Sequence, residues 1–575
     1  MKKLKAGKRR QPALRKGRKK KPPPIRRQIE ETPPPGAVPA PGSDILNEAA
    51  LALQAGRPSA ALAHCQAALA TDSGNAEALN LAGIALFQLG EAKQALSMLE
   101  TAVAYHPDHI DALNNLGNVR KTLGWLTEAE AAYRRALEVD PGYVNGRFNL
   151  GIVHELMGRF AAAETAYRRC IAARPAFAEA HFNLANVMKA LGRLDEARQS
   201  YRLALDLDAA LAAAHNNLAT VEQEFGRLDE AERGFAKAIE LDPDFGEAHY
   251  NAGVILQETG RFEDAISAYR RTVEIEPGHA GAQVNIGYAL KQLDRLDEAE
   301  AVYRRAMEIA PDYDKVVANL GDLLLECGKP TAAVAVCDDF LADHPGSTSV
   351  LAFKAMALAE AGDDAGAHVL LDFDRLLAPI IIDAPAGFAD VTAFNDALCD
   401  HVLAHPSLTQ APASHATRHG RHSGELLSEP LGPMANFEEV VRVAVEDYCQ
   451  ARPADPVHPF LAQRPAGLGL SMWGVVMATQ GHQIAHIHPA AWLSGVYYPR
   501  LPDAVRDDDS NHAGWIEFGR PPEDFHSSAE PSLKLVRPEE GLMILFPSYF
   551  YHGTVPFRAE SPRFSIAFDV LPLAE

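Results

Sequence analysis

The chain has 575 residues and a formal net charge of −21 at pH 7, and a chain of this length is expected to fold as two or more domains. Its 47% hydrophobic and 23% charged residues are typical of a water-soluble globular protein, and no apolar stretch approaches the length of about 18 residues that would predict a membrane span. Six cysteines lie scattered without a C-x-x-C pair, which predicts free thiols in a reducing compartment, with the cytoplasm as the expected location.

The first 42 residues differ in composition from everything that follows. Residues 1–28 carry 14 Lys and Arg and no acidic residue, so the remainder holds 41 basic against 76 acidic residues. A Pro-rich stretch follows, and no apolar segment of a secretory signal is present. We expect residues 1–42 to be a disordered basic and Pro-rich tail, which either stays solvated or contacts nucleic acid or another anionic surface.

A period of 34 residues organises the next part of the chain. A Gly or Ala recurs at positions 49, 83, 117, 151, 185, 219, 253, 287, 321 and 355. Seven places later a glycine recurs at positions 56, 90, 124, 158, 192, 226, 260, 328 and 362, with Asp294 as the exception. Prolines keep the same period at positions 107, 141, 175, 243, 277, 311 and 345.

Each recurring residue has a structural use. The small residue lets two helices approach closely, the glycine ends the first helix because it adopts the left-handed cap conformation, and the proline stops the second helix. The pattern resembles the tetratricopeptide repeat. The resemblance implies about ten repeats over residues 43–378, stacked into an all-α superhelical solenoid whose concave surface binds a protein or a peptide.

An asparagine ladder lies inside this period. It occupies the position two residues before the small residue, at Asn115, Asn149, Asn183, Asn217, Asn251, Asn285 and Asn319. A fixed position in each repeat places these amides in one row, and an amide both donates and accepts the hydrogen bonds that an extended peptide backbone needs. The row is similar to that of the repeat arrays of O-linked sugar transferases, which implies peptide binding; the alternative is a solvated consensus position.

The period fails after residue 378. Residues 379–467 contain a strand-like run and two helical patterns, and we expect a helical linker and support segment for the domain that follows. Between the two helical patterns, "SHATRHGRHSGELL" is rich in His and Arg, and its histidines could form a metal cluster, but no carboxylate pattern accompanies them. We expect a loop there, with its three histidines (415, 419 and 422) facing the surface or a substrate.

Residues 468–575 have the pattern of a β domain. Short β-branched and aromatic runs, such as "LSMWGVVMATQ", "GLMILFP" and "RFSIAFDVL", alternate with turn residues. Seven or eight short antiparallel strands in this length predict a jelly roll or a related barrel.

Histidines and an arginine are spaced through this β region. His486 and His488 are two residues apart, so on an extended segment both rings point to the same side. His552 follows late in the region, and Arg563 begins an R-x-S motif eleven residues further on. This order resembles the iron(II)/2-oxoglutarate oxygenases, whose double-stranded β-helix carries H-x-[DE], a distal histidine and a later Arg or Lys.

The resemblance implies a role for each of these residues. It makes iron(II) the metal and 2-oxoglutarate the co-substrate, on an α+β domain with a double-stranded β-helix core. The three metal ligands would be His486, His488 and His552. Arg563 would pair with the distant carboxylate of 2-oxoglutarate, supported by Ser565, and Tyr497 or its neighbour Tyr498 would line the same pocket.

His488 departs from the family pattern, since an Asp or Glu usually stands there. Either the site uses three histidines, or His482, a water or an outside carboxylate (Glu517 or Asp503) completes it. We expect an oxygenase that hydroxylates a protein or peptide held by the repeats. The alternatives are a non-enzymatic adaptor with an inactive jelly roll and a three-histidine cupin-type dioxygenase that does not use 2-oxoglutarate.

Overall fold

The computed structural model describes residues 43–411, 416–428, 431–506, 511–523 and 525–573. The tail predicted at residues 1–42 and the first of the three loop histidines, His415, lie outside the described residues. The chain divides into two compact units, with the division between Pro243 and Asp244, inside the helical array. The unit that ends at Pro243 contains α1–α12, and the unit that begins at Asp244 contains the remaining elements.

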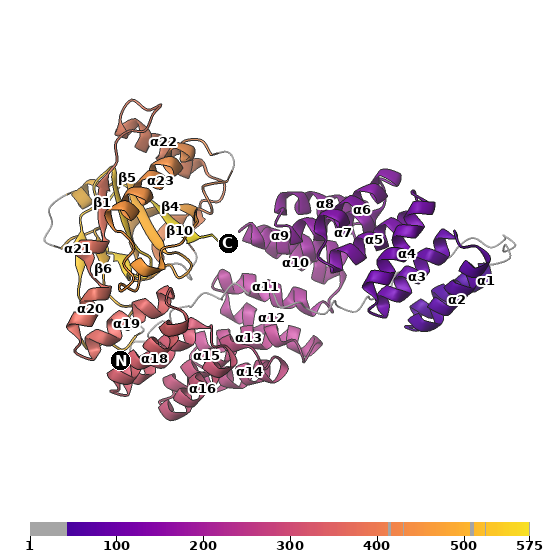
Figure 1. Ribbon diagram of the computed structural model, residues 1–575, viewed down its shortest axis with the longest axis horizontal. Coiled ribbons are helices and arrows are strands. Elements are labelled where there is room, and N and C mark those ends of the chain that lie inside the picture. Colours follow the sequence, from indigo (N-terminus) through magenta and orange to yellow (C-terminus); the bar gives the residue numbers. More distant parts are fainter. Residues whose placement is uncertain (1–42, 412–415, 429–430, 507–510, 524, 574–575) are drawn as a thin grey trace. The chain divides into compact units, whose positions relative to one another are not determined.

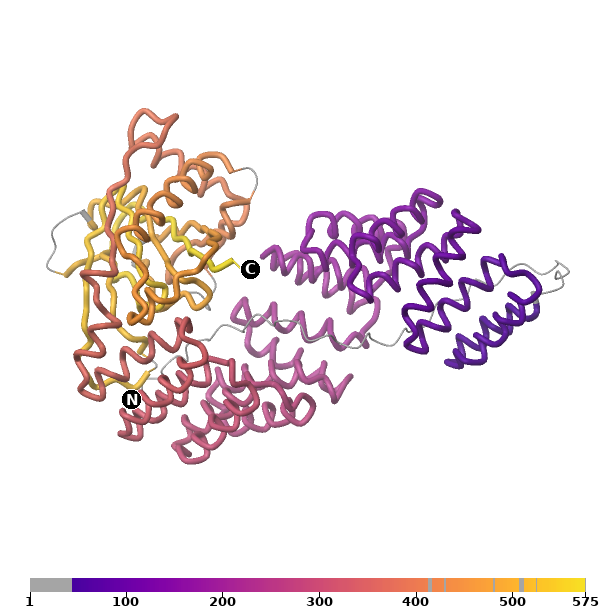
Figure 2. Tube along the Cα trace, viewed as in Figure 1, coloured from indigo at the N-terminus to yellow at the C-terminus, as the bar shows by residue number. Residues whose placement is uncertain are grey.

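Helices of similar length alternate from Ser43 to Leu370, and consecutive members pack in pairs (Figures 1 and 2). In the first unit they are α1 (Ser43–Gln54), α2 (Pro58–Thr71), α3 (Ala76–Gln88), α4 (Ala92–Tyr105), α5 (Ile110–Thr122), α6 (Leu126–Val139), α7 (Val144–Leu156), α8 (Phe160–Ala173), α9 (Ala178–Ala190), α10 (Leu194–Leu207), α11 (Ala212–Glu224) and α12 (Leu228–Leu241). In the second unit they are α13 (Gly246–Glu258), α14 (Phe262–Ile275), α15 (Ala280–Gln292), α16 (Leu296–Ile309), α17 (Asp314–Glu326), α18 (Pro330–Asp343), α19 (Thr348–Glu360) and α20 (Asp364–Leu370).

The turn and contact positions of the repeat behave as its sequence predicts. Every glycine of the turn series has a positive φ, between 66° and 85°, and Asp294 takes the same conformation with a φ of 61°. A Cβ atom added at Gly287 would lie 2.4 Å from the ring of Tyr303, so the small residue is required where α15 and α16 meet. The predicted fold class, a helical solenoid followed by a domain with a curled antiparallel sheet, is confirmed.

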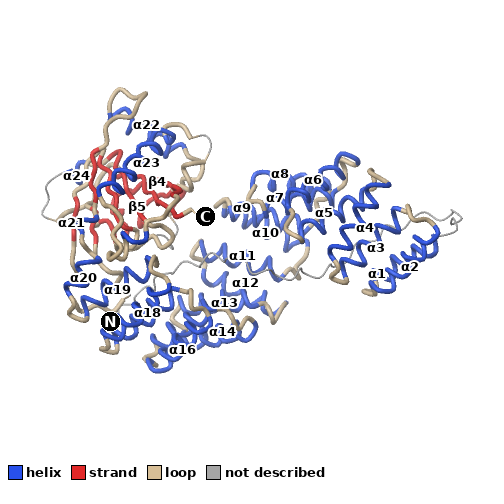
Figure 3. The backbone as a smooth tube through the Cα atoms, in the orientation of Figure 1, coloured by secondary structure: helices blue, strands red, loops and turns tan. Residues whose placement is uncertain are grey.

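Two antiparallel sheets form the C-terminal domain (Figure 3). The larger has the order β1-β8-β5-β10-β4-β3-β2, and the smaller has the order β7-β6-β9. The strands are β1 (Ala378–Ile381), β2 (Thr409–Gln410), β3 (Thr417–His422), β4 (Leu468–Gln483), β5 (Leu493–Arg500), β6 (Ile516–Phe518), β7 (Lys534–Val536), β8 (Leu542–Pro547), β9 (His552–Thr554) and β10 (Arg563–Pro572). This arrangement is jelly-roll-like.

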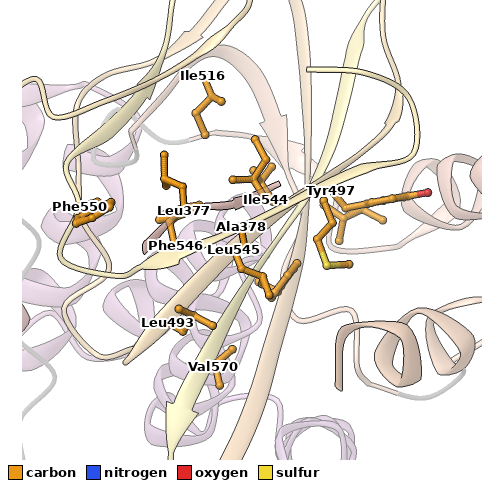
Figure 4. Close-up of a cluster of buried hydrophobic side chains, with 14 of the residues drawn as sticks. Leu377, Ala378, Leu493, Tyr497, Ile516, Ile544, Leu545, Phe546, Phe550 and Val570 are labelled. Atoms are coloured by element: carbon orange, nitrogen blue, oxygen red, sulfur yellow. The ribbon is translucent and has the colours of Figure 1, made fainter. Parts of the chain in front are cut away.

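Two helices, α22 (Val391–Ala404) and α23 (Met434–Ala451), cover the outer face of the larger sheet. The ring of Phe437 on α23 lies 5.1 Å from that of Tyr497 on β5 and 6.2 Å from that of Phe568 on β10. Figure 4 shows Tyr497 within the buried hydrophobic cluster of this domain. Short elements complete it: α21 (Phe373–Leu376), η1 (Leu461–Gln463) and α24 (Asp503–Arg506).

The loop expected at residues 414–427 was a wrong prediction in part, because residues 417–422 form strand β3. β3 pairs with β4 near the edge of the larger sheet, next to the two-residue strand β2. Strands near a sheet edge carry charged and polar side chains, which removes the apolar alternation by which a strand is recognised. His419 on this strand is exposed, and His422 is half-buried against Trp473.

The last repeat and the β domain share one hydrophobic core. Leu351 and Leu358 of α19 belong to the same buried cluster as Tyr497 and Phe568 of the larger sheet. The hydroxyl of Tyr549 donates to the carbonyl of Leu370 at 2.6 Å. Burial of apolar surface stabilises a folded structure by about 25 cal/mol per Å². The apolar surface buried in this shared cluster therefore stabilises the contact between the end of the array and the sheet.

Hydrogen bonds connect the loop between β6 and β7 to the last repeats. The Glu360 carboxylate accepts hydrogen bonds from the backbone and hydroxyl of Ser528 and from the backbone of Ala529. The Asp322 carboxylate accepts from the backbone of His526 at 2.6 Å.

None of the helices in the described residues combines the length and the apolar character needed to cross a bilayer.

Candidate metal centre

His486 and His552 are brought side by side by the backbone. His486 follows β4 and His552 begins β9, and each backbone N–H donates to the other residue's carbonyl at 3.0 Å. His488 is fixed by its own N–H, which donates to the carbonyl of Ser548 at 3.1 Å. The three predicted ligands therefore come from two segments that lie against each other.

The three imidazole rings converge. Their centroids are 4.3 Å apart for His486 and His552, 5.1 Å for His488 and His552, and 5.3 Å for His486 and His488. One ring nitrogen from each lies within 4.8 Å of those of the other two, which is the spacing of a group that can hold one metal ion. Among the described residues this is the one cluster of three or more metal-binding side chains, and it does not include His482, Glu517 or Asp503.

The tautomer of each ring follows from its partner. Nδ1 of His486 lies 2.8 Å from the Ile484 carbonyl, and Nδ1 of His552 lies 3.0 Å from the Phe550 carbonyl. A carbonyl only accepts, so both Nδ1 atoms carry the proton and both Nε2 atoms present a lone pair. Nδ1 of His488 lies 2.5 Å from Oδ1 of Asp569, which sets the same tautomer.

Burial keeps two of these histidines neutral. It lowers the pKa of His486 to about 3, with the neighbouring His488 lowering it further. Burial likewise places the pKa of His552 well below its ordinary value. A neutral imidazole is the form that binds a metal, so these two rings are ready ligands at neutral pH.

The carboxylates that the sequence offered as alternative ligands are occupied or distant. Glu517 forms a bidentate ion pair with Arg520, and Asp503 is exposed on α24. Three nitrogen donors on one side suit iron(II), which accepts imidazole and needs open positions for other ligands. The side chains present therefore fit the metal, with three histidines as its protein ligands.

A cavity of about 320 Å³ lies beside the three rings, and one face of β10 forms part of its wall. Ser565, Ala567 and Asp569 alternate along that face, as the period of a strand requires. Tyr498 also lines this cavity. Tyr497, by contrast, points to the helical side and donates to Oδ1 of Asn395 at 2.6 Å, so the prediction of Tyr497 in the co-substrate pocket is corrected to Tyr498.

Arg563 is the most unusual charged residue of this region. Its side chain is 1% exposed, and its Nε and Nη1 atoms have no hydrogen-bond partner among the described residues. Its guanidinium lies 4.8 Å from the ring centroid of Tyr498, and burial lowers its pKa. A buried cation with unused donors is costly, so this geometry fits an anionic ligand such as a carboxylate.

A second cavity, of about 630 Å³, meets the first at His486. One wall comes from the repeats, with Lys315 and Asn319 on α17 and Ser349 on α19. The remaining wall includes Gly553 of β9 and, from the loop after β6, Arg520, Glu523 and Phe525. Phe525 packs on Phe353 of α19 at 5.5 Å between ring centroids, so the repeats support this wall as well.

The ladder asparagines are half-buried, except Asn319, which is buried. Several of their amide nitrogens bond within the array: Asn115 to Asn80, Asn149 to Asn114, and Asn217 to Asn186, each at 2.9 Å. Asn285 donates to the hydroxyl of Tyr250 at 3.3 Å, and Asn319 donates to the carbonyl of Lys315 at 2.6 Å. The amide oxygen of Asn217 also accepts within the array, from Asn216 at 3.1 Å. Peptide binding by the row stays a prediction.

Asp569 is the residue that sequence reasoning missed. Ser494 of β5, its register partner, donates a hydrogen bond to Asp569 Oδ1 at 2.7 Å, the same oxygen that His488 contacts. The signal was present in the motif R-x-S-x-A-x-D, because alternation on β10 places the aspartate on the same face as Arg563 and Ser565.

The fold and the site define a class of protein: a helical-repeat array joined to a jelly-roll domain that carries a three-histidine centre. Comparison with protein families makes this specific. Models of the tetratricopeptide repeat match residues 52–118, 108–176, 148–212, 216–280, 256–320 and 290–357. The model described as "Putative 2OG-Fe(II) oxygenase" matches residues 471–569. The chain thus carries tetratricopeptide repeats and a C-terminal domain of that oxygenase family.

Solved structures similar to this chain include other helical-repeat proteins. The Cut9–Hcn1 hetero-tetramer of the APC/C is 17% identical over 49% of this chain and 55% of that chain, with a TM-score of 0.39. A tetratricopeptide repeat protein from Parabacteroides merdae is 19% identical over 44% and 98%, with a TM-score of 0.36. A thermophilic repeat protein from Thermus thermophilus is 25% identical over 32% and 98%, with a TM-score of 0.28. Comparison with curated proteins gives no match.

Proposed function

We propose that this protein is an iron(II)- and 2-oxoglutarate-dependent oxygenase that hydroxylates a protein or peptide substrate. The observation that carries the proposal is the pairing, on one domain, of a convergent three-histidine group with the buried guanidinium of Arg563, whose Nε and Nη1 atoms have no hydrogen-bond partner among the described residues. The family match over residues 471–569 supports the same class.

The residues of this chain divide the work between two ligands. His486, His488 and His552 would hold the iron through their Nε2 atoms. Arg563 would form a charge-assisted pair with the distant carboxylate of 2-oxoglutarate, with Ser565 and Tyr498 lining the cavity beside it. With the metal bound, 2-oxoglutarate and dioxygen yield succinate and carbon dioxide while one oxygen atom enters a C–H bond of the acceptor.

The larger cavity favours an acceptor that arrives from the repeats. It shares His486 with the cavity that Ser565 and Asp569 line, and Asn319, a member of the ladder, forms part of its wall. A protein segment lying along the first helices of the last repeats would reach the metal through this cavity. The repeats would then select the substrate, while the β domain would carry out the reaction.

The test is an anaerobic titration with iron(II) and 2-oxoglutarate, followed by succinate release in air. We expect the wild-type protein to bind both and to release succinate slowly without an acceptor. His552→Ala loses iron binding, whereas Arg563→Ala keeps iron but loses saturable 2-oxoglutarate binding. The controls are His419→Asn and Arg558→Ala, which change exposed residues.

The outcomes separate the competing functions. A wild-type protein that binds no iron would be an adaptor, in which the repeats alone carry the function. A protein that binds iron but does not bind 2-oxoglutarate, with Arg563→Ala indistinguishable from wild type, would be a three-histidine dioxygenase of the cupin type.

The contact of the basic tail with nucleic acid or an anionic surface stays a prediction, because residues 1–42 lie outside the described residues.

A further inference from the structure

The three histidines differ in the hydrogen-bond partner of their Nδ1 atoms. His486 and His552 donate their Nδ1 protons to neutral backbone carbonyls, whereas His488 donates to the carboxylate of Asp569. The His488–Asp569 contact is short, at 2.5 Å, and the two side chains are only 12% and 14% exposed. One ligand of the centre therefore has a negatively charged partner, and the other two do not.

The position of this pair matters. His488 stands where the H-x-[DE] pattern of the family has a carboxylate in direct contact with the metal. Here an imidazole takes the metal-facing place, and a carboxylate lies on the far side of that imidazole. Counting Asp569, the ligand group has the same net charge as two histidines and one carboxylate.

Asp569 is held in place by the sheet. Ser494, which is fully buried, donates its hydroxyl to Asp569 Oδ1, and the two residues are register partners on β5 and β10. The ring of Trp473 on β4 lies 5.5 Å from that of His488 and covers it. The carboxylate and the ring are thus oriented by contacts that do not depend on a metal.

We propose that Asp569 is a positioning residue that lets His488 replace the usual ligand carboxylate. It holds the proton on Nδ1 so that Nε2 faces the metal, and its charge makes that imidazole a stronger donor. The same charge favours the more oxidised metal, because attraction between opposite charges grows with the charge on the ion. This inference rests on the proposed function, and it concerns how the centre is tuned.

The first experiment separates orientation from charge. Asp569→Asn keeps an oxygen that accepts from Nδ1 but removes the charge, and Asp569→Ala removes both. We expect the affinity for cobalt(II), used as a stable probe, to fall about tenfold in Asp569→Asn and about 100-fold in Asp569→Ala. The Fe(III)/Fe(II) midpoint potential should rise in Asp569→Asn, and Ser494→Ala should show a smaller change of the same sign.

The second experiment restores the family pattern. His488→Asp alone places two carboxylates against each other, so we expect weak cobalt(II) binding. The double variant His488→Asp/Asp569→Asn has the charge of the wild-type site and should recover most of the affinity. A residue that served only to stabilise the sheet would give no such recovery.

Thermal unfolding of the metal-free variants is the structural control. We expect Asp569→Asn to unfold at the wild-type temperature while its cobalt(II) affinity falls. The inference is overturned if Asp569→Asn binds cobalt(II) with the wild-type affinity and spectrum, or if its affinity loss is matched by unfolding of the metal-free protein. If the wild-type protein binds neither cobalt(II) nor iron(II), the proposed function itself fails.

Discussion

Buried histidines in this protein are defined by the partners of their two ring nitrogens. At the metal centre each Nδ1 donates to a nearby oxygen, so each Nε2 is left for a ligand. His458, which is 4% exposed, has the opposite arrangement. Its Nε2 donates to the Val369 carbonyl at 3.1 Å, and its Nδ1 accepts from the backbone N–H of Phe460 at 3.2 Å. His458 is therefore a structural residue that must stay neutral.

This arrangement predicts a pH-dependent stability. Burial, with Arg375 nearby, lowers the pKa of His458 in the folded state, so the unfolded chain binds the proton more readily. The stabilisation is present above about pH 6.5, the pKa of an unfolded histidine, and is lost as the pH falls below that value, with a slope of at most about 1.4 kcal/mol per pH unit. We expect His458→Asn to be less stable at pH 7 but to lose less stability between pH 7 and pH 5.

The measurement is urea unfolding followed by the fluorescence of the tryptophans of the β domain. His526→Asn, which changes an exposed histidine, is the control and should keep the wild-type slope. Equal slopes in wild type and His458→Asn would contradict the prediction.

Single residues of the centre were predictable where chemistry and spacing agree. The convergence of His486, His488 and His552 could be expected from the H-x-H motif and the later histidine, and the structure brings these three side chains together. The role of Arg563 stays a prediction. The sequence does not distinguish Tyr497 from Tyr498, because it does not show which face of β5 meets the helices. Asp569 shares a strand face with Arg563 and Ser565, but its role becomes visible only when the structure places His488 against it.

At the scale of elements, the helix turns are the most regular feature. Nine turns use a glycine with a positive φ, and the tenth uses Asp294 in the same conformation. A side chain in this region costs roughly 1 kcal/mol, less for Asp and Asn than for other residues. A Cβ atom at the equivalent Gly260 would meet nothing within 4 Å, so crowding does not contribute there.

Asp294→Gly should therefore stabilise the repeats. We expect a gain of about 0.5–1 kcal/mol in the free energy of unfolding, because glycine adopts the left-handed conformation without strain. The reciprocal variant Gly260→Asp is the matched control and should lose a similar amount. Urea unfolding monitored by circular dichroism measures both, and a loss of stability in Asp294→Gly would show that the aspartate has a compensating contact.

The helices were predictable because their signal repeats, whereas the short strands were not all recognised. Each repeat restates the same small residue and turn glycine, so an error in one unit is corrected by the others. The segment that forms β3 occurs only once in the chain and is polar, and it is a strand because it pairs with β4. Long-range pairing of this kind leaves little trace in local composition.

At the scale of the whole chain, the end of the repeat period is not the end of a core. The period fails after residue 378, yet α19 contributes Leu351 and Leu358 to the cluster beneath the sheet. Sequence periodicity indicates how the helices of the repeats pack on each other. It does not indicate that the last repeat also packs against the sheet of the β domain. The predicted domain boundary at residues 378 and 379 stays a prediction.

We expect a fragment of residues 379–575 to aggregate, because it exposes the cluster surface that α19 and α20 cover. A fragment of residues 244–575, which corresponds to the compact unit that begins at Asp244, should not aggregate and should bind cobalt(II) with the full-length affinity. Size-exclusion chromatography and cobalt(II) titration test both expectations. A monomeric 379–575 fragment with a sharp thermal transition would show that the β domain folds without the repeats.

The hydrogen bonds from the β6–β7 loop to Asp322 and Glu360 determine which repeat units can be duplicated or lost without disturbing the β domain. Both acceptors sit in the last two helix pairs, so a whole unit duplicated or lost further upstream leaves every one of these bonds intact. Natural variation can therefore lengthen or shorten the array while the contacts that hold the β6–β7 loop beside the candidate metal centre are kept.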